Sequence, residues 1–225
     1  MSGLPPKVSG VYRGILFVLF LFLPGAPTHA QSENNGLIVA LRHQWAHIKY
    51  QLPKNQRKGA FRKLYARARQ IRITHPGKAE PLLWEGIILT DYAGERGGLK
   101  ALQMIKQSRK LFEKALKINP YASHGAAYTQ LGNLYFEVPG WPLGFGDRDK
   151  ARSLLKKGLS ISPDGLDTNY FMGKFLLRQK KHREAARYFQ RALAVLPRPG
   201  RMIADTGRKS DARRMLEQIT QKLKH

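Results

Sequence analysis

The chain has 225 residues, of which 42% are hydrophobic, and this is enough apolar surface for one folded core. It has no cysteine, which excludes disulfides, iron–sulfur clusters and thiolate zinc sites. The formal net charge of +25 favours anionic partners, namely acidic proteins, anionic lipid or nucleic acid. A generally basic proteome in the source organism would explain the same charge.

The first thirty residues have the layout of a cleavable secretory signal. Lys7 and Arg13 give a positive start, residues 14–23 form an unbroken apolar run, and residues 28–30 (THA) provide small side chains before a cleavage site. The run is about half the roughly 20 residues that a membrane-spanning helix needs. We therefore expect cleavage after Ala30 and a periplasmic or secreted protein, with a retained signal anchor as the alternative. Export disfavours nucleic acid as the partner.

Two helices are expected before the repeats begin. One lies around residues 37–51, within an N-terminal helical cap assigned to residues 31–56. The other spans residues 57–73, where apolar residues recur at spacings of three and four and so form one stripe. The members of this stripe are Phe61, Leu64, Tyr65, Ala68 and Ile71.

Three segments that end alike indicate an internal repeat. They are ALKINP at 115–120, GLSISP at 158–163 and ALAVLP at 192–197, and each is typical of an amphipathic helix stopped by proline. Their starts are 43 and then 34 residues apart, and about 34 residues is the period of the two-helix tetratricopeptide (TPR) unit. We assign residues 57–200 to a TPR-like repeat domain and residues 201–225 to a C-terminal cap with a helix at 208–223.

Small residues at matching places let the two helices of a unit approach closely. The middle and last units carry them in the expected pattern, except that glycine stands at 158 where alanine is usual. The repeat positions are Gly132, Ala151, Gly173, Ala185, Phe189, Ala192 and Pro197.

The first two units are longer than 34 residues. We expect the extra length to lie between their helices, at residues 93–98 and 138–147, with both loops on one rim of the stack. Asp147 is a predicted helix N-cap, and so is either Asp167 or Thr168. The predicted fold is all-α: a right-handed α-solenoid of TPR-like helix pairs with loops inserted within repeats.

Several motifs resemble those of a family of bacterial exported TPR proteins. They are LWEG at 83–86, GNLY at 132–135, VPGWPLGFGD at 138–147, PDG at 163–165 and NYF at 169–171. The resemblance covers about residues 60–220 and extends, more distantly, to the periplasmic T component of TRAP transporters. It implies a helical protein that assists a solute-binding protein and its membrane transporter, and it implies no catalytic residues.

The leading functional hypothesis is an exported adaptor whose concave face binds a protein, acidic in character, or a small anionic ligand. Both packing and partner binding would explain the aromatic residues of the loop at 138–147. The alternatives are an accessory of a periplasmic solute transporter and a cytosolic binder of nucleic acid or acidic protein. The candidate contact residues are Trp84, Tyr92, Tyr128, Trp141, Phe145, Asn169 and Tyr170.

The sequence also contains two features that are typical of other kinds of site. Basic residues cluster at 57–72 and 178–191, and they would allow contact with an anionic membrane surface. His43 and His47 share a helical spacing, but no third metal ligand is near them in the sequence. The chain has no nucleophile elbow, zinc-protease motif or phosphate loop, so we expect no enzyme, cofactor or metal site.

Overall fold

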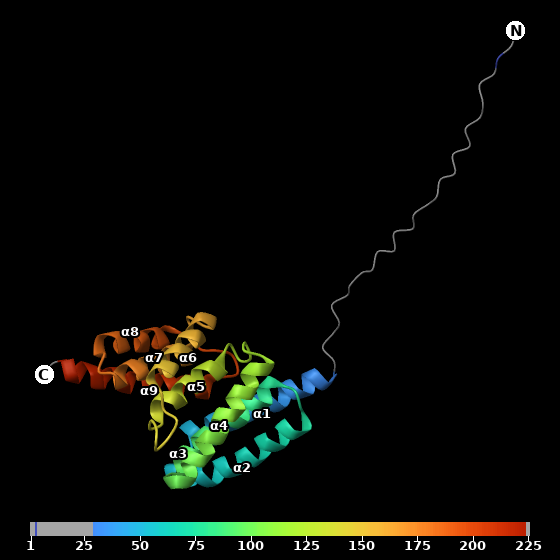
Figure 1. Cartoon of the computed structure of the whole chain (residues 1–225), viewed down its shortest axis with the longest axis horizontal. Coiled ribbons are helices and arrows are strands. Elements are labelled where there is room, and N and C mark those ends of the chain that lie inside the picture. Colours follow the sequence, from blue (N-terminus) through green and yellow to red (C-terminus); the bar gives the residue numbers. More distant parts are fainter. Residues whose placement is uncertain (1–2, 4–28, 224–225) are drawn as a thin grey trace.

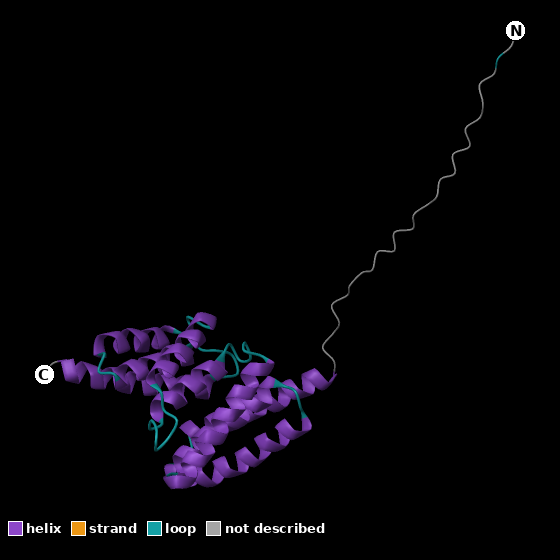
Figure 2. Ribbon diagram, in the orientation of Figure 1, coloured by secondary structure: helices purple, strands orange, loops and turns teal. Residues whose placement is uncertain are grey.

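The computed structural model describes residue 3 and residues 29–223, and within them it contains nine α-helices and no strand (Figure 1, Figure 2). The all-α prediction is confirmed, and nearly all of the predicted signal lies outside the described residues. The helices are α1 (His29–Tyr50), α2 (Lys54–Thr74), α3 (Ala79–Arg96), α4 (Gly98–Ile118), α5 (Ala126–Glu137), α6 (Arg148–Ile161), α7 (Leu166–Arg178), α8 (His182–Ala194) and α9 (Met202–Leu223).

Helices α3–α4, α5–α6 and α7–α8 form three pairs with the same internal packing. In each pair a glycine on the first helix lies directly against a large side chain on the second. A Cβ added at Gly132 would lie 2.7 Å from Leu155 Cγ, and one added at Gly173 would lie 2.8 Å from Phe189 Cε1. The predicted close approach of the paired helices is therefore confirmed. The glycines create the space, and a bulky neighbour fills it.

The unusual Gly158 has a specific packing reason. A Cβ added there would lie 2.5 Å from Thr129 Oγ1, whereas the last pair has the fully buried Ala192 at the matching position. Thr129, on the first helix of the pair, therefore occupies the space that alanine would need. The departure from the repeat pattern is compensated within the same helix pair.

The loop predicted at residues 93–98 does not exist. Helix α3 continues through Arg96, and Gly97 alone separates it from α4. Gly97 and Gly98 have φ values of 66° and 69°, a region that glycine adopts readily, so the chain reverses direction without a loop. The extra length lies instead in the helices, which have 18 and 21 residues. Only one of the two predicted rim loops is therefore present.

The first and last helices of the described chain contact each other. Helix α9 packs against α8, α7 and α1, while α1 also packs against α3 (Figure 1). At the contact of the ends, Gly207 of α9 lies so close to the ring of Tyr50 in α1 that a Cβ could not fit. Because α5 contacts both α3 and α7, these three helices form a row along the inner side of the stack, and α1 and α9 cover that side through their contacts with α3 and α7.

Substitution of the two kinds of glycine should have opposite effects. Gly173→Ala would place its methyl group into the ring of Phe189, and we expect it to lower the free energy of unfolding by about 1 to 3 kcal/mol. Gly59→Ala, in α2 with open space around it, should raise the free energy by about 0.5 to 1 kcal/mol. Denaturant unfolding followed by circular dichroism measures both, and a change of the same sign in both variants would contradict this packing.

Candidate functional site: the inner face and the 138–147 loop

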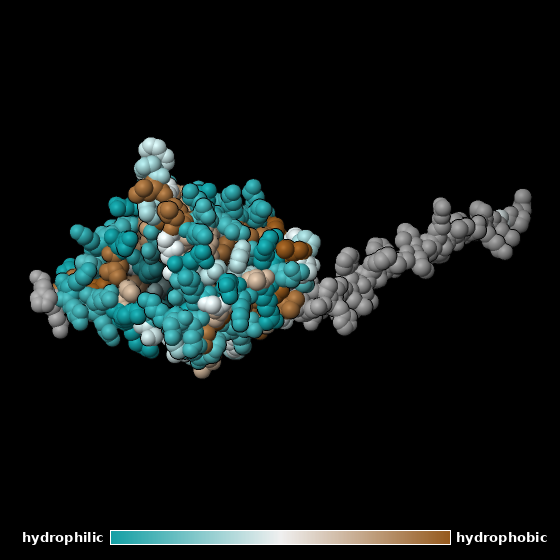
Figure 3. Space-filling model, turned by 90° about the horizontal axis from the view of Figure 1, so that it is seen from below, coloured by the Kyte–Doolittle hydropathy of each residue, from teal (hydrophilic) through white to brown (hydrophobic). Residues whose placement is uncertain are grey.

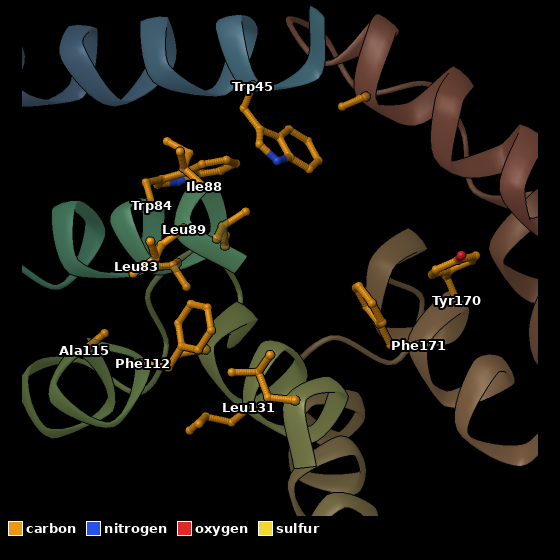
Figure 4. Packing of buried hydrophobic residues seen from close by; sticks show 14 of the residues in the cluster. Trp45, Leu83, Trp84, Ile88, Leu89, Phe112, Ala115, Leu131, Tyr170 and Phe171 are labelled. Carbon is orange, nitrogen blue, oxygen red and sulfur yellow. The ribbon is translucent and has the colours of Figure 1, made fainter. Parts of the chain in front are cut away.

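Four of the predicted contact residues lie in the core, not on an open concave face. Trp84, Tyr92, Asn169 and Tyr170 are 3%, 8%, 0% and 5% exposed. Figure 4 shows Trp45 pointing from α1 toward Trp84 on α3, and their rings meet edge to face at 5.8 Å. These side chains are covered by neighbouring helices and serve packing in this structure.

Each of the other buried candidates also has an internal partner. The guanidinium of Arg208, on α9, lies 4.5 Å from the ring centre of Tyr170. Tyr92 lies beside Tyr65 of α2, with their ring centres 6.3 Å apart. The side-chain nitrogen of Asn169 donates hydrogen bonds of 2.7 and 2.9 Å to backbone carbonyls of the α6–α7 connection. Tyr128, on α5, is half-buried.

Asp167 does not cap α7, although the sequence suggested it. The helix begins at Leu166, and neither Asp167 nor Thr168 provides a side-chain cap. The hydroxyl of Thr168 instead donates to the carbonyl of Ser162 over 2.6 Å. The Asp167 carboxylate is directed to arginines: the Nε of Arg208 donates a hydrogen bond of 2.9 Å to it.

Two more arginines complete an ionic cluster between α7 and α9. Arg198 and Arg201 approach Asp167 to 3.6 and 3.7 Å, and Arg198 also forms a two-point contact of 3.0 and 2.6 Å with buried Asp205. Burial acts to raise the pKa of Asp167, but the charges of Arg208, Arg201 and Arg198 outweigh it and lower that pKa to about 2. The spacing of three to four residues between the charged positions on α9 is the sequence signal that could have predicted one shared face.

The contribution of this ionic cluster to the free energy of unfolding should depend on pH. The pKa of Asp167 is lowered from 3.8 to about 2, so its contribution is complete above pH 4 and disappears as the pH falls toward 2. We expect Asp167→Asn to lower the free energy of unfolding by about 1 to 2 kcal/mol at neutral pH. Unfolding curves between pH 2 and 7 should show the difference from wild type shrinking below pH 4. Asp164→Asn, at an exposed and unpaired carboxylate, is the matched control, and a pH-independent difference for Asp167→Asn would contradict the assignment.

The connection between α5 and α6, residues 138–147, is the predicted loop that the structure retains. Figure 2 shows it leaving the helical body as a long loop. Three backbone hydrogen bonds hold it: Gly144 N–H donates to the carbonyl of Gly140 (3.0 Å), Gly146 N–H to that of Pro139 (2.8 Å) and Asp147 N–H to that of Tyr135 (2.9 Å). A Cβ on Gly146 would overlap the carbonyl oxygen of Val138, so the close return of the chain requires glycine there.

The two aromatic residues of this loop have different environments. Phe145 is half-buried, meets the ring of Tyr135 edge to face at 5.3 Å, and lies 4.5 Å under the guanidinium of Arg109. Trp141 is 89% exposed and Leu143 is 73% exposed. Phe145 therefore anchors the loop to the helices, while Trp141 and Leu143 face solvent.

The base of the loop is also fixed. Asp147 is the N-cap of α6, as predicted: its carboxylate accepts hydrogen bonds of 3.0 Å from Asp149 N–H and 2.9 Å from Lys150 N–H. The exposed apolar side chains are thus carried by a loop that is held at both ends and in its middle.

The remaining surface gives no sign of metal chemistry. Within the described residues, no group of three histidine or acidic side chains is placed to hold a metal ion. His43 and His47 are exposed on α1, and His47 Nδ1 lies 2.7 Å from Gln51 Oε1. None of the helices in the same residues combines the length and hydropathy needed to cross a membrane. The face in Figure 3 is mainly hydrophilic, with hydrophobic side chains in separate patches.

Comparisons with known proteins find likeness only at the level of solved structures. No model of a known protein family matches the chain, and no curated protein matches its sequence. A structure of MamA from AMB-1 is 20% identical over 79% of this chain and 94% of that one, with a TM-score of 0.44. A second MamA crystal structure is 18% identical over 72% of this chain and 100% of that one, with a TM-score of 0.31. The assignment of TPR-like helix pairs thus rests on the repeated packing described above.

Proposed function

We propose that this chain is a scaffold that binds an acidic protein partner through the loop at residues 138–147, with Trp141 as the apolar anchor. The observation that carries the proposal is the 89% exposure of this tryptophan. Large aromatic side chains are costly to leave in water and are enriched among the residues that dominate binding energy at protein interfaces. Leu143, 73% exposed, extends the apolar contact on the same loop.

The rigidity of the loop supports this role. A flexible loop loses conformational freedom when it is fixed by a partner, and that loss opposes binding. Here the backbone hydrogen bonds, the Asp147 cap and the packing of Phe145 hold the loop before any partner arrives. Trp141 is therefore presented at a small entropic cost.

Charge supports an acidic partner. Arg109 and Lys150 lie against Phe145 and Tyr135 at the base of the loop, and Arg148 is exposed at the start of α6. With a formal net charge of +25 on the whole chain, electrostatic attraction favours proteins with acidic surfaces and speeds their approach. A solute-binding protein of a transporter would be one such partner.

Photo-crosslinking tests the proposal in the cells that make the protein. A photoreactive phenylalanine analogue at position 141 should trap one acidic protein, whereas the same analogue at Leu99, which is 88% exposed on α4, should not. The purified partner should then bind wild type, lose at least about tenfold affinity to Trp141→Ala, and bind less tightly as salt rises. Trp141→Ala should leave the free energy of unfolding within about 0.5 kcal/mol, because the side chain is exposed.

Two results would contradict this role for the loop. One is the same set of crosslinked proteins from positions 141 and 99. The other is an unchanged affinity of the purified partner for Trp141→Ala. The identity of the partner separates a general adaptor from an accessory of a solute transporter, since only the second requires a solute-binding protein.

We further propose that the scaffold is exported, on the strength of the charged, apolar and small-residue segments of residues 1–30. The protein purified from its producing cells should begin at Gln31 and be found outside the cytoplasm. Amino-terminal sequencing of the fractionated protein measures both, and a cytoplasmic protein that retains residues 1–30 would contradict export.

A further inference from the structure

Two adjoining chambers lie between α1, α3 and the start of α9. The apolar chamber has a volume of about 210 Å³, and most of its wall is hydrocarbon. The arginine chamber is smaller, about 80 Å³, and reaches inward to α5 and α7. Trp45, Trp84 and Arg201 line both chambers, so the two are neighbours that share one wall. Other members of the apolar wall are Ala46, Met202, Ile203 and Ala204.

The charged side chains that line these chambers are mostly positive. Four arginines line them, Arg42, Arg198, Arg201 and Arg208, against the single carboxylate of Asp167. Arg198 and Arg208 are hydrogen-bonded to aspartates, so their charges are largely compensated. The excess of positive charge therefore belongs to the two remaining arginines.

Among the three arginines of the Asp167 cluster, Arg201 has the least compensated charge. Its carboxylate neighbours, Asp167 and Asp205, lie 3.7 and 3.9 Å away, beyond hydrogen-bond distance, although its side chain is only 21% exposed. Burial, together with the charges of Arg198 and Arg42, lowers the pKa of Arg201 against the opposing effect of the two carboxylates. A guanidinium in this position gains from an additional anion.

Two buried donors that belong to residues of the apolar chamber wall also lack acceptors. The indole nitrogen of Trp84, a residue that is 3% exposed, has no hydrogen-bond partner, and neither has the buried Nε of Arg42. Unpaired polar atoms in a folded interior are uncommon because leaving them unpaired costs free energy. The first turn of α9, residues 202–204, adds the positive end of a helix whose first N–H groups have no acceptor within the helix.

We propose that this pair of chambers binds a small organic carboxylate with a flat apolar body, its charge at Arg201 and its body in the apolar chamber, against the wall that Trp45, Trp84 and Ala46 form. The size fits this class, because an apolar cavity of about 150 Å³ is known to take up benzene. An inorganic anion would leave the hydrocarbon wall uncovered, and a long-chain lipid exceeds the volume. His43 and Met202 are exposed at the edge of the apolar chamber, so a ligand reaches it from solvent.

The tryptophans provide a direct readout. The chain has three tryptophans, and Trp45 and Trp84 line the chambers. In a Trp141→Phe background, tryptophan fluorescence therefore reports only the chambers, and the loop at residues 138–147 does not contribute. Benzoate should change this fluorescence in a saturable way, while benzamide, which has nearly the same shape but no charge, should bind at least about tenfold more weakly.

Three variants connect the effect to the site. Arg201→Gln should weaken benzoate binding at least about tenfold, whereas Arg213→Gln, at an exposed arginine of α9, should change it less than about twofold. Ala46→Leu, which fills the apolar chamber without altering charge, should abolish binding while preserving or raising the melting temperature. Circular dichroism shows whether each variant is folded.

The proposal is overturned by equal affinity for benzoate and benzamide, or by unchanged binding in folded Arg201→Gln or Ala46→Leu. It is also overturned if benzoate does not bind wild type at concentrations up to about 10 mM, the weak limit for a specific small-molecule site. None of these outcomes bears on the role of Trp141, which is absent from the protein that is measured.

Discussion

Helix α9 is held in place by charge buried against the inner side of the stack, and the arrangement of the interior depends on this contact. Arg208 is 5% exposed and Asp205 3% exposed, and each would be costly to bury without a partner. Asp167 on α7 and Arg198 in the connection before α9 supply those partners. With α9 fixed, Gly207 meets Tyr50, α1 is brought into contact, and the tryptophans of α1 and α3 are enclosed.

The helix pairs could be predicted from the sequence because their determinants are local and repeated. Gly132 and Gly173 each stand in the same helix pair as the large residue that they accommodate, Leu155 and Phe189, so the pattern can be recognised within one unit. The covering of the inner face by α1 and α9 could not be predicted in this way. Tyr170 is covered by Arg208, and Trp84 by Trp45 of the first helix. These contacts join segments that are distant in the sequence and carry no repeat signature.

Two local predictions failed for a different reason. A glycine-rich segment suggests a loop, but at Gly97 and Gly98 the positive φ values form a sharp joint between two long helices. Asp167 has the right residue type and place for a helix cap, yet its carboxylate is paired with three arginines instead. Asp147 has no comparable neighbours, and there the cap prediction is confirmed. Asp167 therefore compensates the buried charge of Arg208 and does not cap α7, whereas Asp147 caps α6.

The contact between the first and last helices changes how such a protein can evolve and unfold. In an open array each unit touches only its neighbours, so units can be gained or lost and the ends can fray independently. Here one additional unit would carry α9 away from α1 and break the joint at Tyr50 and Gly207. The contact between α1 and α9 thus restricts the number of units. It also means that the terminal helices should unfold together with the middle of the chain.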